Sequence, residues 1–120
     1  MESDSQKKIA NSEYRVIWHP FCKEDLSEIN RGIAEGLMRN VDYKLSQAPL
    51  LIGSPLKGMP KLIYKVGYTQ KYRVLYIVNQ KAKEVWVLAV KNRDTVYKAH
   101  QFQHMVNLAN NLHTAWRKHS

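Results

Sequence analysis

The chain is 120 residues long, with 44% hydrophobic and 24% charged residues, as in an ordinary globular domain. Its one cysteine, Cys22, excludes an internal disulfide, and no apolar run approaches the ~20 residues that a membrane helix needs. The first residues contain no apolar stretch that would direct secretion, so we expect a cytoplasmic protein without a membrane partner. We expect a flexible tail over residues 1–13 and a single domain over residues 14–120.

The net charge of +9 belongs to the second half of the chain. Residues 1–60 contain eight basic and eight acidic residues, whereas residues 61–120 contain eleven basic residues and only two acids. A one-sided excess of this kind favours a polyanionic partner, either a nucleic acid or an acidic protein. The alternative is a basic surface that only keeps the protein soluble.

The first half predicts one strand followed by two helices. Residues 14–18 are β-branched and aromatic, as in a strand, and Pro20 cannot continue it. Apolar residues recur at spacings of three and four from Leu26 to Leu37, which predicts a helix, and a second helix is expected over residues 41–48. The apolar residues that follow, up to residue 55, are broken by Gly and Pro and are interpreted as an ordered connection.

The second half predicts a sheet followed by one long helix. Three apolar runs separated by gaps of hairpin length predict an antiparallel meander, with the first strand added at an edge. From Val96 to Trp116 the period is that of a helix, and Asp94 is placed to cap its N-terminus. The predicted fold is α+β, with an antiparallel sheet of about four strands, the order β-α-α-β-β-β-α, helices packed on the sheet and an extended C-terminal helix.

Two hairpin registers decide which basic side chains share a face of the sheet. If Gly67 pairs with Arg73, and Arg73 pairs with Ala89, then Lys65, Arg73 and Lys91 point to the same face, ~7–8 Å apart on the diagonal. Such a cleft could grip a phosphodiester, whereas a slip of one residue would separate the cations and leave ordinary solvent-facing residues. The opposite face would carry the core, namely Tyr64, Val66, Tyr72, Val74, Tyr76, Trp86, Leu88 and Val90.

Several short motifs follow one another along the chain: Leu56-Lys57-Gly58-Met59-Pro60, Tyr64-Lys65-Val66, Tyr72-Arg73-Val74-Leu75-Tyr76 and Lys91-Asn92-Arg93-Asp94-Thr95-Val96-Tyr97. In this order and spacing they resemble the RelE/ParE superfamily of toxins from bacterial toxin–antitoxin modules. The resemblance covers residues 14–99 and implies the compact RelE-like α+β fold.

The superfamily divides by activity. RelE-like members are endoribonucleases that cut mRNA, usually in the ribosomal A site, and ParE-like members inhibit DNA gyrase. The RelE-like pattern implies a catalytic set in this chain, namely Lys65, Arg73, Lys91, Arg93 and Tyr97. Members of this kind often carry a second lysine two residues after the first, and this chain has Gly67 there.

Cleavage of RNA without a metal needs a base for the 2′-OH, cations for the phosphate and an acid for the leaving oxygen. We expect Arg73 to hold the scissile phosphate beside Lys65, a candidate base, while Lys91 and Arg93 bind flanking phosphates. Tyr97 is a candidate acid, base or stacking platform. Further candidates for binding RNA are Lys57, Lys61, Lys71 and His100, although His100 could equally be an ordinary surface residue.

The leading hypothesis is therefore a type II toxin that cleaves mRNA on the ribosome, with an acidic antitoxin encoded next to it as its partner. The alternatives are a ParE-like toxin that inhibits DNA gyrase, and a degenerate relative that binds only its antitoxin. No metal or cofactor is expected, because the pair His100 and His104 has no carboxylate or cysteine ligand near it in sequence. Cys22 has no activating neighbour in sequence, which favours a structural role.

Overall fold

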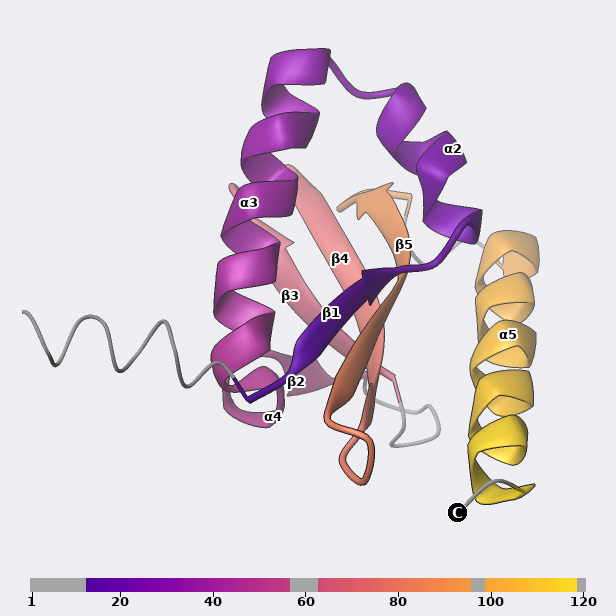
Figure 1. Ribbon diagram of the computed structural model, residues 1–120. Coiled ribbons are helices and arrows are strands. Elements are labelled where there is room, and N and C mark those ends of the chain that lie inside the picture. Colours follow the sequence, from indigo (N-terminus) through magenta and orange to yellow (C-terminus); the bar gives the residue numbers. More distant parts are fainter. Residues whose placement is uncertain (1–12, 57–62, 96–98, 119–120) are drawn as a thin grey trace, which may run out of the picture.

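The computed structural model describes residues 13–56, 63–95 and 99–118, and of residues 99–102 it describes the backbone only. The expected tail falls almost wholly outside these ranges. The elements, in chain order, are β1 (Arg15–Trp18), α2 (Phe21–Ser27), α3 (Arg31–Gln47), α4 (Pro49–Ile52), β2 (Ser54–Pro55), β3 (Tyr64–Tyr68), β4 (Tyr72–Asn79), β5 (Glu84–Asn92) and α5 (Ala99–Lys118) (Figure 1).

The strands form one five-stranded sheet in the order β1-β5-β4-β3-β2. The α+β class and the antiparallel meander of β3, β4 and β5 are confirmed, and β1 lies at an edge as expected. Two details differ from the prediction. β1 pairs with β5 in parallel, because the chain returns to this edge only after a long crossover through the helices. The expected connection forms the short helix α4 and the two-residue strand β2.

The break between the first two helices falls earlier in the chain than predicted. The expected single helix from Leu26 to Leu37 is wrong, because Asn30 separates α2 from α3. The side chain of Asn30 accepts hydrogen bonds from the backbone N–H of Gly32 (3.0 Å) and of Ile33 (3.4 Å), which is a strong N-terminal cap. α3 then runs without interruption to Gln47 and buries four residues on one stripe, namely Ala34, Leu37, Val41 and Leu45.

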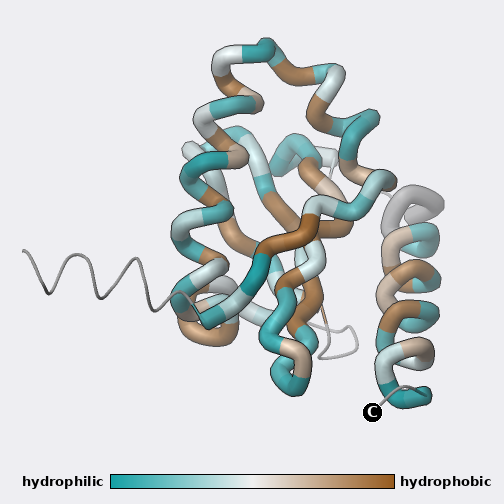
Figure 2. The backbone as a smooth tube through the Cα atoms, viewed as in Figure 1, coloured by the Kyte–Doolittle hydropathy of each residue, from teal (hydrophilic) through white to brown (hydrophobic). Residues whose placement is uncertain are grey.

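The sheet carries an apolar cluster on each face, so both faces are covered (Figure 1). On one face α3 and α2 pack against a cluster formed by Cys22, Leu37, Val41, Leu45, Val66, Val74, Tyr76, Val85, Val87 and Val90. On the other face α5 packs against a cluster formed by Leu56, Ile63, Leu75, Ile77, Leu88, Ala89, Met105 and Ala109. Figure 2 shows the matching pattern, with hydrophobic segments along the strands between α3 and α5.

The register of β3 with β4 is confirmed, since Gly67 pairs with Arg73. The expected pairing of Arg73 with Ala89 is wrong, because Arg73 pairs with Lys91, two residues further along β5. An irregularity after Leu75 skips Leu88, as Leu75 pairs with Ala89 and the next residue of β4 pairs with Val87.

The error of two residues in this register preserves the face of each cation, because side chains alternate with a period of two. Lys65, Arg73 and Lys91 therefore share one face, as expected. The bulge does change the core assignment. Leu88 is buried in the cluster under α5, and Trp86 packs against that cluster, so their predicted place on the opposite face is wrong.

α5 is described from Ala99 onward, and the expected capping of this helix by Asp94 falls on residues 96–98, which lie outside the described ranges, so it stays a prediction. Asp94 itself lies in a turn, where its backbone N–H donates to the side chain of Asn92 (2.9 Å). α5 buries Met105 and Ala109 against the sheet. Among the helices that the structure describes, none is both long and apolar enough to cross a membrane.

Candidate functional site

Lys65 and Arg73 line a small hollow on the face of the sheet that α5 partly covers. Its volume is about 290 Å³, and its walls come from α4, β2, β3, β4 and the turn between the last two. Ser54 of β2 pairs with Lys65 and also faces the hollow. The lining residues are Ile52, Ser54, Lys65, Val66, Gly67, Thr69 and Arg73. The two cations thus lie together in a concave surface, as the predicted register requires.

Gly67 makes room for the guanidinium of Arg73. A Cβ atom at position 67 would stand 3.3 Å from Nη1 of Arg73 and 3.6 Å from its Cζ, so the planar group lies across the glycine. The same Nη1 donates a hydrogen bond to the backbone carbonyl of Tyr72 at 2.8 Å. This half-buried guanidinium is therefore oriented by the strand beneath it. A second lysine at position 67 would displace Arg73 and place a like charge against it.

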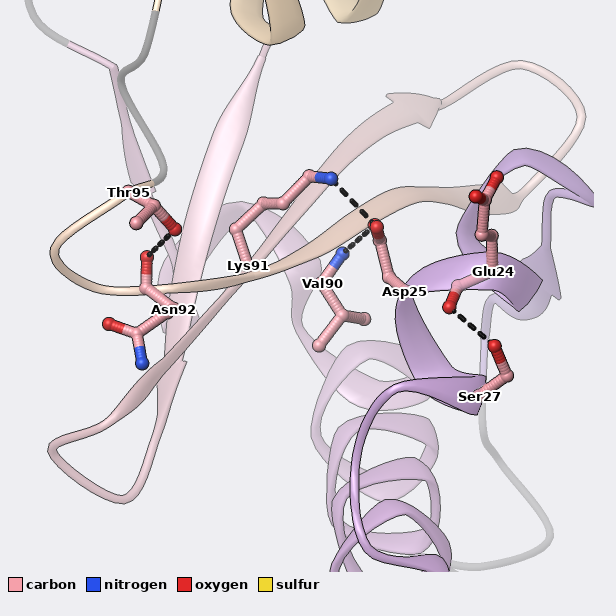
Figure 3. Close-up of polar contacts among 7 residues, drawn as sticks. All are labelled: Glu24, Asp25, Ser27, Val90, Lys91, Asn92 and Thr95. Carbon is pink, nitrogen blue, oxygen red and sulfur yellow. Dashed lines mark hydrogen bonds and ion pairs between the residues drawn. The ribbon is translucent and has the colours of Figure 1, made fainter.

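Lys91 lies on the same face but turns toward α2. Its ammonium is 2.7 Å from Oδ1 of Asp25, whose Oδ2 accepts a hydrogen bond from the backbone N–H of Val90 at 3.0 Å (Figure 3). The side chains of Lys91 and Asp25 are only 21% and 10% exposed, so the pair is shielded from solvent. It borders a second, polar hollow of about 320 Å³ that Lys71 and Thr95 also line.

Lys71 and Arg93 are held next to each other at the same end of the sheet. The backbone N–H of Arg93 donates to the carbonyl of Lys71 at 2.8 Å, which joins the turn after β3 to the end of β5. The ammonium of Lys71 lies 5.6 Å from the ring centroid of Tyr72. Arg93 is 58% exposed and 3.9 Å from the carboxylate of Asp94, a distance at which a surface pair contributes little. Both cations can therefore reach an approaching polyanion.

A wider hollow than these two lies elsewhere on the molecule. It has a volume of about 740 Å³ and separates the turn between β4 and β5 from the end of α5, where Trp116 and Arg117 line it. None of the predicted catalytic residues with a described side chain lines this groove. Lys65, Arg73 and Lys91 line smaller hollows than this one.

No family model and no curated protein matches the sequence. Solved structures do match its fold. The chain is 25% identical to a chain of the RelBE2 toxin–antitoxin complex from Mycobacterium tuberculosis, with a TM-score of 0.62, over 68% of this chain and 92% of the other. The chain has a RelE-like fold.

Two E. coli structures share the fold at lower identity. The isolated E. coli RelE toxin is 19% identical, with a TM-score of 0.55, over 78% of this chain and 96% of that one. A chain of the intact E. coli RelBE toxin–antitoxin complex is 22% identical, with a TM-score of 0.54, over 64% of this chain and 93% of the other. The RelE-like fold expected from the short motifs is therefore confirmed.

Several residues of the predicted RelE-like set fall outside the described ranges. Tyr97, Lys57 and Lys61 lie in the undescribed segments, and of His100 only the backbone is described. Their roles stay predictions. The side chains that the structure does place divide into three groups, with Lys65 and Arg73 in the hollow, Lys71 and Arg93 at the exposed end, and Lys91 in the ion pair.

Sequence reasoning missed two polar residues that lie beside these cations, Asp25 and Ser54. Neither was among the candidate site residues, and Ser54 lies in the segment that was expected to form an ordered connection. Asp25 lies 66 positions before Lys91 in the chain, so no local pattern joins them. Ser54 and Pro55 form a short edge strand beside Lys65. This Ser-Pro segment was the one local feature of the sequence that could have indicated the strand.

Burial shifts the pKa of two titratable groups near α2. Desolvation, with a contribution from the charge of Asp25, raises the pKa of the Cys22 thiol to about 11. This supports the structural role expected for Cys22, because the thiolate is the nucleophile. Burial also lowers the pKa of His19, whose Nδ1 accepts a hydrogen bond from the backbone N–H of Phe21 (3.0 Å). Within the described residues no group of three or more potential metal ligands comes together.

Proposed function

We propose that this chain is the toxin of a type II toxin–antitoxin module and that it cleaves mRNA on the ribosome without a metal ion. The observation that carries the proposal is the hollow in which the guanidinium of Arg73 lies across Gly67, beside Lys65. A planar, oriented guanidinium is suited to a phosphate, because its N–H groups match two phosphate oxygens. The RelE-like fold supports the same reading.

In the proposed reaction the 2′-oxygen of the RNA attacks the adjacent phosphorus and the bond from phosphorus to the 5′-oxygen breaks. A base takes the proton of the 2′-OH, and an acid gives a proton to the leaving 5′-oxygen. Arg73 and Lys65 stabilise the charge that develops on the phosphate oxygens. Lys65 and Tyr97 are the candidates for the two proton transfers. Lys71 and Arg93 would contact flanking phosphates from the exposed end of the sheet.

The proposed partner is an acidic antitoxin. The structures that the chain resembles include toxin–antitoxin complexes, and the excess positive charge of residues 61–120 would attract an acidic protein. mRNA and the ribosome, which are also polyanions, would compete for the same charge. Lys57, Lys61 and His100 remain candidate contacts for RNA.

The test compares Arg73→Ala with Lys81→Ala, which removes an equal charge from an exposed turn outside the hollow. Cleavage of ribosome-bound mRNA, mapped by primer extension, should fall by roughly 100-fold or more in Arg73→Ala, as for loss of one charge-stabilising donor. Lys81→Ala should cut at the same positions as the wild type. Equal cleavage by a folded Arg73→Ala protein would refute the nuclease proposal.

Inhibition of DNA gyrase is the second candidate, and two observations favour it. Gly67 replaces a lysine that nucleases of this kind often carry, and Lys91 is occupied by Asp25. In this case the purified chain would inhibit DNA supercoiling while ribosome-bound mRNA stays intact. A chain that does neither, but binds its antitoxin, would be the degenerate relative.

A further inference from the structure

Arg73 and Lys91 are direct neighbours across β4 and β5, so two cations start from opposed positions on one face. Side chains in such positions have Cβ atoms about 4.5–5.5 Å apart, and like charges there are destabilising. In the structure the two side chains extend in different directions, which separates their charges. The guanidinium of Arg73 lies over Gly67 of β3, on one side, and the ammonium of Lys91 contacts Asp25 of α2, on the other.

Asp25 is fixed firmly enough to hold Lys91 in this direction. Its carboxylate uses one oxygen for the ammonium (2.7 Å) and the other for the backbone N–H of Val90 (3.0 Å), and Figure 3 shows both contacts. Its side chain is 10% exposed, so water competes little for the same contacts. Because α2 also packs along β5, the carboxylate belongs to a packed helix and not to a loose surface.

We propose that Asp25 is a positioning residue that keeps Lys91 away from Arg73. Arg73 and Lys65 then form the phosphate site, and Lys91 serves as the partner of Asp25 instead of the phosphate ligand that the RelE-like pattern implies. To bind a phosphate, Lys91 would have to leave a nearly buried carboxylate unpaired beside an incoming polyanion. The part of this inference that concerns RNA rests on the proposed nuclease function.

Thermal unfolding tests the positioning role without RNA. In Asp25→Asn the released ammonium of Lys91 lies beside Arg73, and Tm should fall by roughly 5 °C or more. Arg73→Gln should then be less harmful to Tm in the Asp25→Asn background than in the wild type, because it removes the repulsion. Lys81→Gln is the control and should have the same effect in both backgrounds. Additive effects of Asp25→Asn and Arg73→Gln would overturn the proposal.

The salt dependence of RNA binding tests the reassignment of Lys91. The probe is a single-stranded 2′-O-methyl RNA of twelve nucleotides, which binds but lacks the attacking 2′-OH. The slope of log K against log salt should lose about 0.7 in Arg73→Gln, as for one phosphate contact, and should be unchanged in Lys91→Met. An equal loss of slope in Lys91→Met would overturn the reassignment.

A double variant separates loss of charge from loss of a contact. Asp25→Asn combined with Lys91→Met removes both partners of the ion pair. The affinity of this double variant for the RNA should stay within about twofold of that of the wild type. Binding as weak as in Arg73→Gln would again identify Lys91 as a phosphate ligand. If the wild type shows no salt-dependent RNA binding, the proposed function fails, and the thermal cycle alone then decides the role of Asp25.

Discussion

The two faces of the sheet differ in how far their apolar clusters extend. The face under α3 is apolar from β3 across to β5, with Val66, Val74 and Val90 all buried. The face toward α5 is apolar only as far as Leu75 and Ala89. Two residues further along the same strands, the side chains on this face are those of Arg73 and Lys91. One face therefore serves stability throughout, whereas the other is divided between a core and a set of cations.

This division explains how one small sheet can hold a stable core and a charged hollow together. α5, Leu56 and Ile63 cover the apolar part of the second face, with Met105 and Ala109 buried. The charged part is left beside the turn after β3, where the hollow forms. Substitutions under α3 should therefore change stability, and substitutions around Arg73 should change activity.

The largest effect is expected from Leu37→Ala in the cluster under α3. Leu37 is completely buried, and removing its side chain should lower the free energy of unfolding by about 2–5 kcal/mol through lost burial and a residual cavity. Urea unfolding measures this. Ile33→Ala on the same helix is the matched control, since Ile33 is 42% exposed and its truncation should cost about 0.5 kcal/mol or less. Equal losses would mean that α3 presents a different face to the sheet.

A smaller loss of stability is expected at the junction between α2 and α3. Asn30→Ala removes the side chain that caps α3 and should cost about 1 kcal/mol. Asn30→Asp keeps an acceptor in the same place and should retain the stability of the wild type. Chemical denaturation of the three proteins checks the prediction. If Asp is as harmful as Ala, the cap is not the source of the effect.

Gly67→Ala should lower activity without lowering stability, because position 67 lies in the charged part of the second face. The added Cβ would stand 3.3 Å from the guanidinium of Arg73 and should shift it, lowering RNA cleavage on the order of tenfold, since a misplacement of 1 Å can cost 100-fold. Stability should stay constant or rise by up to about 1 kcal/mol, because Gly is unfavourable within a strand. Unchanged cleavage would show that the position of Arg73 over Gly67 is not required.

The smallest effect is a loss of stability at mildly acidic pH through His19. Burial lowers the pKa of His19 in the folded chain below its ordinary value of 6.5, so the unfolded chain binds the proton more readily. Stability is therefore fully present above pH 6.5 and declines as the pH falls below it. Urea midpoints between pH 7.5 and 5.5 measure the decline. His19→Asn keeps an acceptor for the N–H of Phe21 and should show a smaller decline, whereas an identical pH profile would exclude His19 as its source.

Local patterns predicted much of the fold and part of the site. The meander, the long last helix and the pairing of Gly67 with Arg73 follow from apolar spacing and a short turn, which act over a few residues. The common face of Lys65 and Arg73 follows from that turn alone, since one hairpin contains both residues. These features are local, so the sequence near them contains the information that they need.

The features of the fold that were predicted wrongly depend on contacts that apolar spacing does not report. The bulge at Leu88 and the parallel pairing of β1 depend on how the completed sheet packs against helices from other parts of the chain. The break at Asn30 was missed because apolar spacing continued across a capping residue whose hydrogen bonds decide where a helix begins. In each case a contact or cap outweighed the periodicity of the apolar residues.

The sequence by itself determined that this is a basic α+β chain with a RelE-like fold, and that Arg73 and Lys65 lie on one hairpin. Only the tertiary structure decided what Lys91 does, because the group that orients it is distant in the chain. The guanidinium of Arg73 lies over Gly67 of the same hairpin, whereas Lys91 contacts Asp25, which lies 66 residues before it. The direction of a charged side chain is set by the nearest opposite charge and the available space, and both arise only when the chain has folded.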